Sequence, residues 1–153
     1  MNLVHHFRAL RTGVLGILLL LGGCAGQPHG PAATLAGTTW QLEVIQSAGD
    51  ATDTLRIAEG SRFTLSFGLD GRAALRLDCN RGQGSYTLEP AADGRSGTLA
   101  FGALATTRAL CEPPRLDTRV ARDLSLVRSY QLKDGNLILT LADGVIYQWA
   151  PLH

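Results

Sequence analysis

Residues 137–149, LILTLADGVIYQW, carry the clearest secondary-structure signal in this chain. Two short apolar runs, 137–141 and 145–149, are separated by the pair Asp143-Gly144. An Asp-Gly pair provides the positive-φ residues that a tight hairpin turn requires. The stretch therefore predicts two antiparallel strands joined by a turn near the C-terminus.

The same alternation of apolar and polar residues recurs from Gly37 onward. Because successive side chains of a strand point to opposite faces, a period of two predicts strands with one buried and one solvated face. Asp70-Gly71 and Asp134-Gly135 predict further tight turns. The residues predicted to face inward are Trp40, Leu42 and Val44, then Phe63, Leu65, Phe67 and Leu69, then Leu75, Leu77 and Cys79.

One segment, after Pro113-Pro114, has helical spacing instead. Asp117 in its first turn and Arg128 near its last turn suit the helix dipole. Many short antiparallel strands and one such helix predict a mainly β fold: an antiparallel barrel or a strongly bent sheet, with one amphipathic α-helix before the last strands. The apolar helix positions are Leu116, Val120, Leu124 and Val127, and the opposite face is expected to carry Arg119, Arg122, Asp123 and Ser125.

The N-terminus has the three parts of an export signal. Arg8 and Arg11 precede the apolar run 13–20, and Leu21-Gly22-Gly23-Cys24 resembles the lipobox of bacterial lipoproteins. The resemblance implies that residues 1–23 are a lipoprotein signal peptide and that the thiol of Cys24 is acylated. The lipid on Cys24 would then attach the protein to a membrane.

A membrane-spanning anchor is the alternative interpretation of the N-terminus. The uncharged run 12–27 contains five glycines, however, and is short of the roughly 20 predominantly apolar residues that a span needs. Because Ala25 rather than Asp follows the cysteine, the resemblance implies the outer membrane, facing the periplasm. Residues 24–36 contain prolines and glycines but no charge and predict a flexible tether, which leaves 37–151 as one folded domain.

The charge of the mature chain is close to zero. The full chain has 14 Lys and Arg against 13 Asp and Glu, and removal of Arg8 and Arg11 with the signal peptide leaves 12 against 13. Binding to nucleic acid or to anionic lipid headgroups requires clustered positive charge. We therefore expect no nucleic-acid partner, and contact with the membrane only through the lipid on Cys24.

Four blocks of sequence occur in a specific order and spacing. They are LAGTTWQL at 35–42, DCN at 78–80 with GSY at 84–86, TTRALC at 106–111, and LIL at 137–139 continuing through Tyr147. Together they resemble the META domain, the HslJ-like family of bacterial envelope proteins, over Leu35 to Pro151. At Leu110, before the last cysteine, the family often has methionine.

The resemblance implies an all-β fold of antiparallel strands with a helix before the final strands. It also implies an association with heat shock, with resistance to the antibiotic novobiocin, and with secretion or motility in some organisms. No catalytic residue or substrate is established for the family as a class.

If Cys24 carries lipid, Cys79 and Cys111 remain as an even pair. An oxidising compartment favours a disulfide between them, which on the chain-entropy model would stabilise the fold by about 3 to 4 kcal/mol. The alternative is two free, buried thiols that behave as small apolar groups.

The usual catalytic and metal-binding patterns are missing from the mature sequence. Its histidines are His29 in the tether and His153 at the terminus, so neither supplies a base within the domain. Residues 82–85, Gly-Gln-Gly-Ser, lack the nucleophile-elbow pattern and are predicted to form a turn entering a strand at Tyr86. Two cysteines without core histidines do not make a zinc site, and no phosphate-cradling loop is present. We therefore predict no enzyme, no metal and no cofactor.

Two classes of function follow. The first is a non-catalytic, lipid-anchored envelope module that binds a protein, peptide or small molecule or supports envelope integrity under stress. The alternative is a hydrolase that acts on envelope material through Asp78, Glu112 and Asp117, should these carboxylates converge.

Three polar residues beside the paired cysteines are candidates for a binding site. If the disulfide forms, Arg81 and Arg108 would come close together and, with Asn80, make a small anion-accepting patch. The alternative is structural: Asn80 would satisfy backbone groups in a turn, and the arginines would lie on the solvated face.

Overall fold

The computed structural model describes residues 34–49 and 52–153. The predicted signal peptide, the predicted lipidation site Cys24 and the predicted tether up to residue 33 lie outside the described residues. The described part consists mainly of antiparallel strands. In chain order its elements are β1 (Thr39–Gln46), β2 (Thr54–Arg56), the 3-10 helix η1 (Gly60–Arg62), β3 (Phe63–Phe67), β4 (Arg72–Leu77), β5 (Asn80–Pro90), β6 (Ser96–Phe101), β7 (Ala105–Thr106), α1 (Asp117–Leu124), β8 (Val127–Lys133), β9 (Asn136–Leu141) and β10 (Ile146–Pro151).

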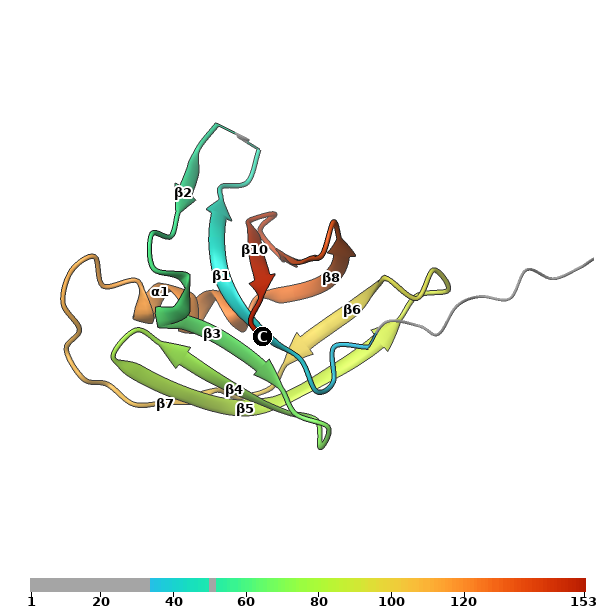
Figure 1. Cartoon of the computed structure of the whole chain (residues 1–153), viewed down its shortest axis with the longest axis horizontal. Helices are drawn as coiled ribbons and strands as arrows, with labels where there is room; N and C mark the ends of the chain where they lie inside the picture. The colour runs from blue at the N-terminus through green and yellow to red at the C-terminus, as the bar shows by residue number, and fades with distance from the viewer. Residues whose placement is uncertain (1–33, 50–51) are drawn as a thin grey trace, which may run out of the picture.

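Eight of these strands close into an antiparallel barrel (Figure 1). The order around the barrel is β1, β3, β4, β5, β6, β8, β9, β10 and back to β1. The short strands β2 and β7 lie outside this ring and pair with β1 and β5. The structure thus confirms the predicted mainly β, barrel-like fold with a helix before the last strands.

The predicted turn at Asp134-Gly135 joins β8 to β9. Both residues have positive φ, 52° and 80°, and Lys133 pairs with Asn136 across the turn. Positive φ at both central residues gives a two-residue turn a backbone twist that matches the right-handed twist of the strands on either side. The last hairpin, β9 and β10, also forms where the alternation predicts it, with Leu137 paired to Trp149.

Side chains fill the interior of the barrel. An eight-stranded barrel encloses a space about as wide as the side chains that point into it. Trp149, Tyr130 and Phe67 are among its largest fully buried residues. β1 and β10 pair with each other and so close the barrel. Leu42 of β1 lies opposite Trp149 of β10, and both side chains are buried in the core.

A β-bulge in β1 changes one predicted core position. The register between β1 and β10 shifts between Leu42 and Val44, and the alternation moves by one residue. Ile45, which is 1% exposed, therefore points into the core, while Val44 is only half-buried. The prediction that Val44 faces inward was wrong because a bulge leaves no signal in a simple alternating pattern.

Two other predicted core positions are also corrected. Leu69 is 86% exposed, because β3 ends at Phe67 and Leu69 falls in the following turn. Cys79 is exposed and Asp78 is buried, the reverse of the prediction. Asp78, with a φ of 61°, and Cys79 form the two-residue connection between β4 and β5. The alternation of buried and exposed residues along β4 therefore ends at Leu77.

The prediction that the glycine-rich stretch 82–85 forms a turn was wrong. These residues are part of β5, an 11-residue strand. This strand pairs with β4, β6 and β7. Glycine is rare in strands unless a neighbouring segment approaches closely. Such an approach occurs here and is described below.

The helix α1 is shorter than predicted. It ends at Leu124, and Val127 is the first residue of β8, so Arg128 also belongs to the strand rather than to the helix. Asp123, expected on the solvated face, is only 5% exposed. Figure 1 shows α1 at the end of the barrel that also holds the β4–β5 turn. Within the described ranges, no helix has the length and apolar character needed to cross a membrane.

Candidate functional site

A disulfide fixes the segment between β6 and α1 to the β4–β5 turn. Cys79 in that turn is bonded to Cys111, with the two Cα atoms 5.5 Å apart. The segment also pairs with β5: the amide of Thr107 donates to the carbonyl of Arg81 (2.9 Å), and the amide of Arg81 donates to Oγ1 of Thr107 (3.0 Å). The residues just after Thr106 are therefore held against the start of β5.

Asn80 is the polar centre of this attachment and is 2% exposed. Its Oδ1 accepts hydrogen bonds from the amide of Ala109 and from Oγ1 of Thr107, each 2.8 Å long. Its Nδ2 donates to the carbonyl of Ala109 and to Oδ2 of Asp117, each at 3.0 Å. Asn80 does satisfy backbone groups, but these belong to the 107–109 segment and not to its own turn.

Two glycines of β5 make room for this segment. A Cβ added at Gly84 would lie 2.7 Å from Cδ2 of Leu104 and 2.8 Å from the carbonyl oxygen of Ala103. A Cβ at Gly82 would lie 3.1 Å from Cγ2 of Thr106. Larger residues at these positions would push the segment away from β5 and change the surface beside it.

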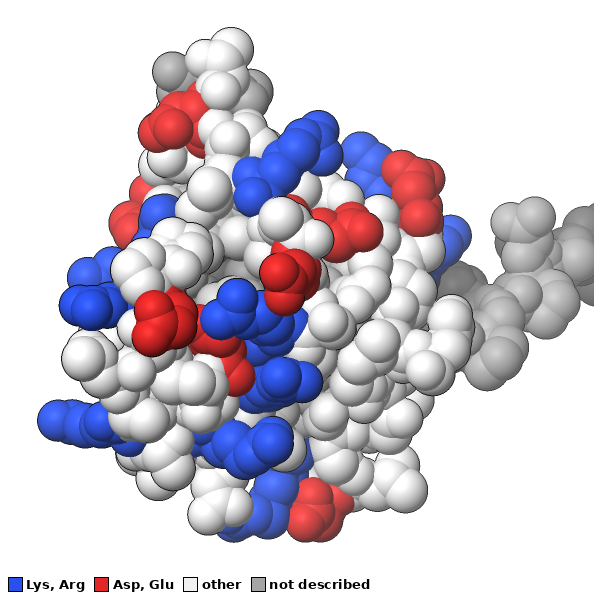
Figure 2. Space-filling view, turned by 60° about the vertical axis from the view of Figure 1, so that its left-hand side comes forward, with Lys and Arg blue, Asp and Glu red and all other residues white. Residues whose placement is uncertain are grey.

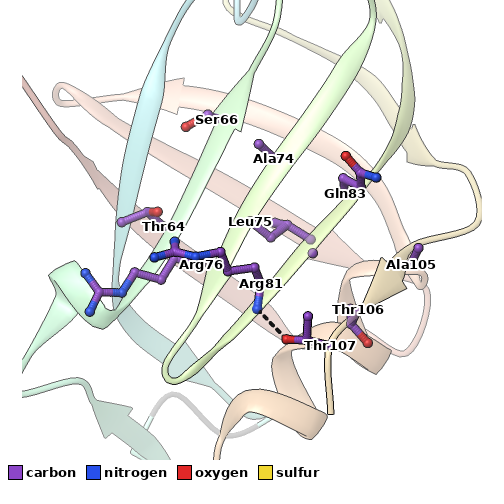
Figure 3. A pocket seen from close by; sticks show the side chains of 11 residues that line it. Thr64, Ser66, Ala74, Leu75, Arg76, Arg81, Gln83, Ala105, Thr106 and Thr107 are labelled. Carbon is purple, nitrogen blue, oxygen red and sulfur yellow. Dashed lines mark hydrogen bonds between the residues drawn. The ribbon is translucent and has the colours of Figure 1, made fainter. Parts of the chain in front are cut away.

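The outer surface of β3, β4 and β5 carries a groove of about 570 Å³, which we call the outer groove (Figure 3). The segment 105–107 forms one of its walls. The register of β3, β4 and β5 sets the side chains that line the outer groove in rows that run across the strands. Thr64, Arg76 and Arg81 form one row, and Ser66, Ala74 and Gln83 form the next.

Arg76 and Arg81 are direct cross-strand neighbours at one end of the outer groove. Both are exposed, and in Figure 3 their side chains run in the same direction, toward the side on which Thr64 lies. Arg76 reaches the carbonyl of Asp78 only at 3.5 Å, and the guanidinium of Arg81 has no hydrogen bond or ion pair within the described residues. No carboxylate is among the residues that line the groove in the described part of the chain.

The outer groove continues along the strands. A second hollow of about 340 Å³ shares Ser66, Ala74 and Gln83 with it and extends to Thr39 and Arg72. The side chains along this extension are small or uncharged until Asp70 and Arg72 at its far end. The two hollows together form one elongated furrow with a strongly basic end.

Arg108 lies in a different hollow from Arg81. A space of about 580 Å³ between the 104–111 segment and α1 is lined by Arg108, Arg115, Arg122 and Asp117. Thr106 and Thr107 line both this space and the outer groove and thus separate them. The structure therefore sets Arg81 beside Arg76, while Arg108 is grouped with arginines near the helix.

Figure 2 views the molecule from the side that carries α1 and the β4–β5 turn, and basic side chains form a band across it with acidic ones between them. Several charged side chains of the described residues are paired. Arg62 forms an ion pair with Asp78, and Arg122 contacts Asp123 at 2.9 Å. Arg81 differs from them in having no such partner in the part of the chain that the structure describes.

The three carboxylates considered for hydrolysis do not share a cleft. Asp78 is buried and accepts a 2.7 Å hydrogen bond from Nε of Arg62. Asp117 faces the space beside α1 and accepts from Asn80, and Glu112 is exposed outside both hollows. Residues 34–49 and 52–153 contain no cluster of three or more His, Cys, Asp or Glu side chains suited to a metal ion.

Arg76 is the site residue that sequence reasoning missed. It appeared only as one solvated residue of an alternating strand. Had Asp78-Cys79 been recognised as a two-residue turn, the register of the hairpin would have set Arg76 opposite Arg81. The burial of Asp123 was not predicted either, because its hydrogen-bond partner Tyr147 is distant in sequence.

A META domain model matches residues 33–151 of the chain. The chain is similar to the NMR structure of a protein from Burkholderia xenovorans, with 26% identity and a TM-score of 0.61, over 85% of this chain and 93% of that one. It also resembles the fold of a second protein solved by NMR, with 23% identity and a TM-score of 0.53, over 74% of this chain and 89% of the other. No curated protein matches it. Since the family model covers nearly all of the folded part, the chain belongs to the META domain family.

Proposed function

We propose that this protein is a lipid-anchored component of the bacterial envelope, attached through Cys24, and that its barrel is a non-catalytic domain that binds a ligand in the outer groove. The lipobox-like sequence supports the anchor, and membership of the META family agrees with an envelope location. The arrangement of Arg76 and Arg81 is the observation that carries the binding role.

Two considerations favour the outer surface of the barrel as the binding region. Core side chains occupy the interior, so a ligand has little room there. In the outer groove, by contrast, two arginines occupy opposite positions of β4 and β5 without a carboxylate among the described lining residues. Like charges on opposite strand positions are unfavourable, and an anionic ligand would relieve this repulsion.

Complementation of a deletion strain tests the proposal. The strain would be grown under envelope stress such as heat or novobiocin, with wild-type protein or with the double variant Arg76→Gln, Arg81→Gln. We expect the double variant to accumulate in folded form and to fail to complement. Arg95→Gln is the matched control, because Arg95 is an exposed arginine in the β5–β6 turn that lines none of the hollows described above. Full complementation by the double variant would contradict the proposal.

The non-catalytic part of the proposal has its own test. Glu112→Gln and Asp117→Asn each remove a carboxylate that the hydrolase alternative would use. We expect both variants to complement as well as wild type, provided they accumulate to the same level. Loss of complementation by a folded Glu112→Gln variant would favour the hydrolase, because Glu112 is exposed and its loss should not disturb folding.

A further inference from the structure

We propose that the ligand of the outer groove is an acidic saccharide, whose carboxylate or phosphate lies at Arg76 and Arg81 and whose hydroxylated body lies along β3 and β4. This inference rests on the proposed binding function and specifies the chemical class of the ligand. It is carried by the contrast between the basic end of the furrow and its uncharged middle, and by the pairing of the strands beneath it.

The basic end suits an oxyanion. Arg76 and Arg81 are adjacent across β4 and β5, and Figure 3 shows their side chains extending in parallel beside Thr64. A guanidinium presents several donors in a planar fork that matches a carboxylate or a phosphate. Because the two arginines come from adjacent strands, both side chains can donate to one oxyanion, and the hydroxyl of Thr64, the cross-strand neighbour of Arg76, can donate to it as well.

The middle of the furrow, before Asp70 and Arg72 at its far end, suits a neutral, hydroxylated body. Along β4 the furrow runs from Arg76 to Arg72, which is four residue steps or about 13 Å at the rise of a strand. Ser66, Gln83 and Thr39 line this part with groups that both donate and accept hydrogen bonds. The small side chain of Ala74 keeps the floor low.

The strands beneath the furrow disfavour an extended peptide. Peptides that bind to sheets commonly add a strand at a free edge. β3 lies between β1 and β4, β4 lies between β3 and β5, and β5 is paired on both sides, so their backbone groups are already used. Among the described residues, the large apolar ones in the lining of the furrow are Leu75 and Phe67, and both are buried, which leaves little to accept a peptide side chain or an acyl chain.

Calorimetric titration of the full chain, purified from membranes in mild detergent, tests this inference. The probes are a disaccharide ending in a uronic acid, the matching neutral disaccharide, a sugar 1-phosphate, inorganic phosphate and an acidic tripeptide. We expect at least one of the two charged sugars to bind about tenfold or more tightly than the neutral disaccharide and inorganic phosphate. The uronic acid and the sugar phosphate distinguish the two kinds of oxyanion.

Variants connect that binding to the furrow. Arg81→Gln should weaken binding of the charged sugar about tenfold or more, and Arg95→Gln should leave it unchanged. Ala74→Leu should block the floor and weaken binding without changing the charge. Its matched control is Thr87→Leu, an exposed position of β5 outside the furrow.

Several outcomes would overturn the acidic-saccharide assignment. They are equal binding of the neutral disaccharide, inorganic phosphate as tight as any sugar, tighter binding of the acidic tripeptide, no binding of any sugar, or no effect of Arg81→Gln. If one of these occurs while the Arg76, Arg81 double variant still fails to complement, the ligand class is wrong and the binding function stands. If the double variant complements fully, the binding function itself fails.

Discussion

The hydroxyl of Tyr147 on β10 donates a 2.7 Å hydrogen bond to Oδ2 of Asp123 on α1, and both residues are buried. Asp123 also contacts Arg119 and Arg122, at 3.4 and 2.9 Å. A buried carboxylate is costly unless it is paired and hydrogen-bonded. The contact therefore joins the helix to the barrel wall and requires both elements to be in place.

Tyr147→Phe should destabilise the protein by about 1 to 3 kcal/mol, because Asp123 would lose a donor inside the protein. The measurement is the free energy of unfolding in urea. Tyr130→Phe is the matched control: the Tyr130 hydroxyl is buried without a hydrogen-bond partner in the described structure, so its removal should be neutral or stabilising. Equal losses in the two variants would show that the Tyr147 hydrogen bond has no special role.

The stability of the protein should fall as pH rises above 10. Burial, followed by the hydrogen bond and the charge of Asp123, raises the pKa of Tyr147 above its ordinary value of 10.0. In that range the unfolded chain loses the tyrosine proton while the folded protein retains it, so unfolding is favoured. Tyr147→Phe should reduce the slope of unfolding free energy against pH between about 10 and 11. An unchanged slope would contradict this assignment.

Replacing both cysteines of the disulfide, Cys79→Ala with Cys111→Ala, should lower the free energy of unfolding by about 3 to 4 kcal/mol on the chain-entropy model. Urea unfolding with and without reductant provides the measurement. Wild type should become less stable in reductant, whereas the double variant should not respond. Two alkylated thiols in the native wild-type protein would contradict the disulfide.

Asn80→Ala should destabilise the protein by about 2 to 3 kcal/mol, because the amide of Ala109 and the carboxylate of Asp117 would both lose a partner. A double-mutant cycle with Asp117→Ala isolates the contact between the two side chains. We expect a coupling energy of about 0.5 kcal/mol or more. Strict additivity would indicate that the 3.0 Å contact contributes nothing to stability.

Cys24→Ala should prevent incorporation of labelled fatty acid and block cleavage before residue 24. Metabolic labelling and intact mass of the purified protein are the measurements. Cys79→Ala serves as the control, since it should leave labelling unchanged. A wild-type protein that carries no acyl group, or that retains residues 1–23, would contradict the proposed lipid anchor.

The sequence predicted those parts of the fold that depend on neighbouring residues. The alternation and the Asp-Gly turn in 137–149 predicted the last hairpin, and Asp134-Gly135 predicted the turn before it. Prediction failed where the residue pattern does not distinguish between two kinds of local structure. The glycines of β5 resemble turn residues, and the bulge in β1 moves the alternation by one residue.

The candidate site was only partly predictable for the same reason. Arg81 and Asn80 were identified because they follow Cys79 in sequence. Arg76 was not, since its proximity to Arg81 depends on the register of the β4–β5 hairpin. Arg108 was expected beside Arg81, but Thr106 and Thr107 lie between the two hollows.

By itself, the sequence determined the strand-rich character of this protein, its Asp-Gly turns and its membership of a recognisable family, because backbone geometry and side-chain alternation act over a few residues. The tertiary structure alone decided which strands close the barrel, which carboxylate is buried against Tyr147, and which arginine lies opposite Arg81. These features depend on strand register and on contacts between residues far apart in the chain. Local preferences do not specify such contacts, which form only when the core is packed.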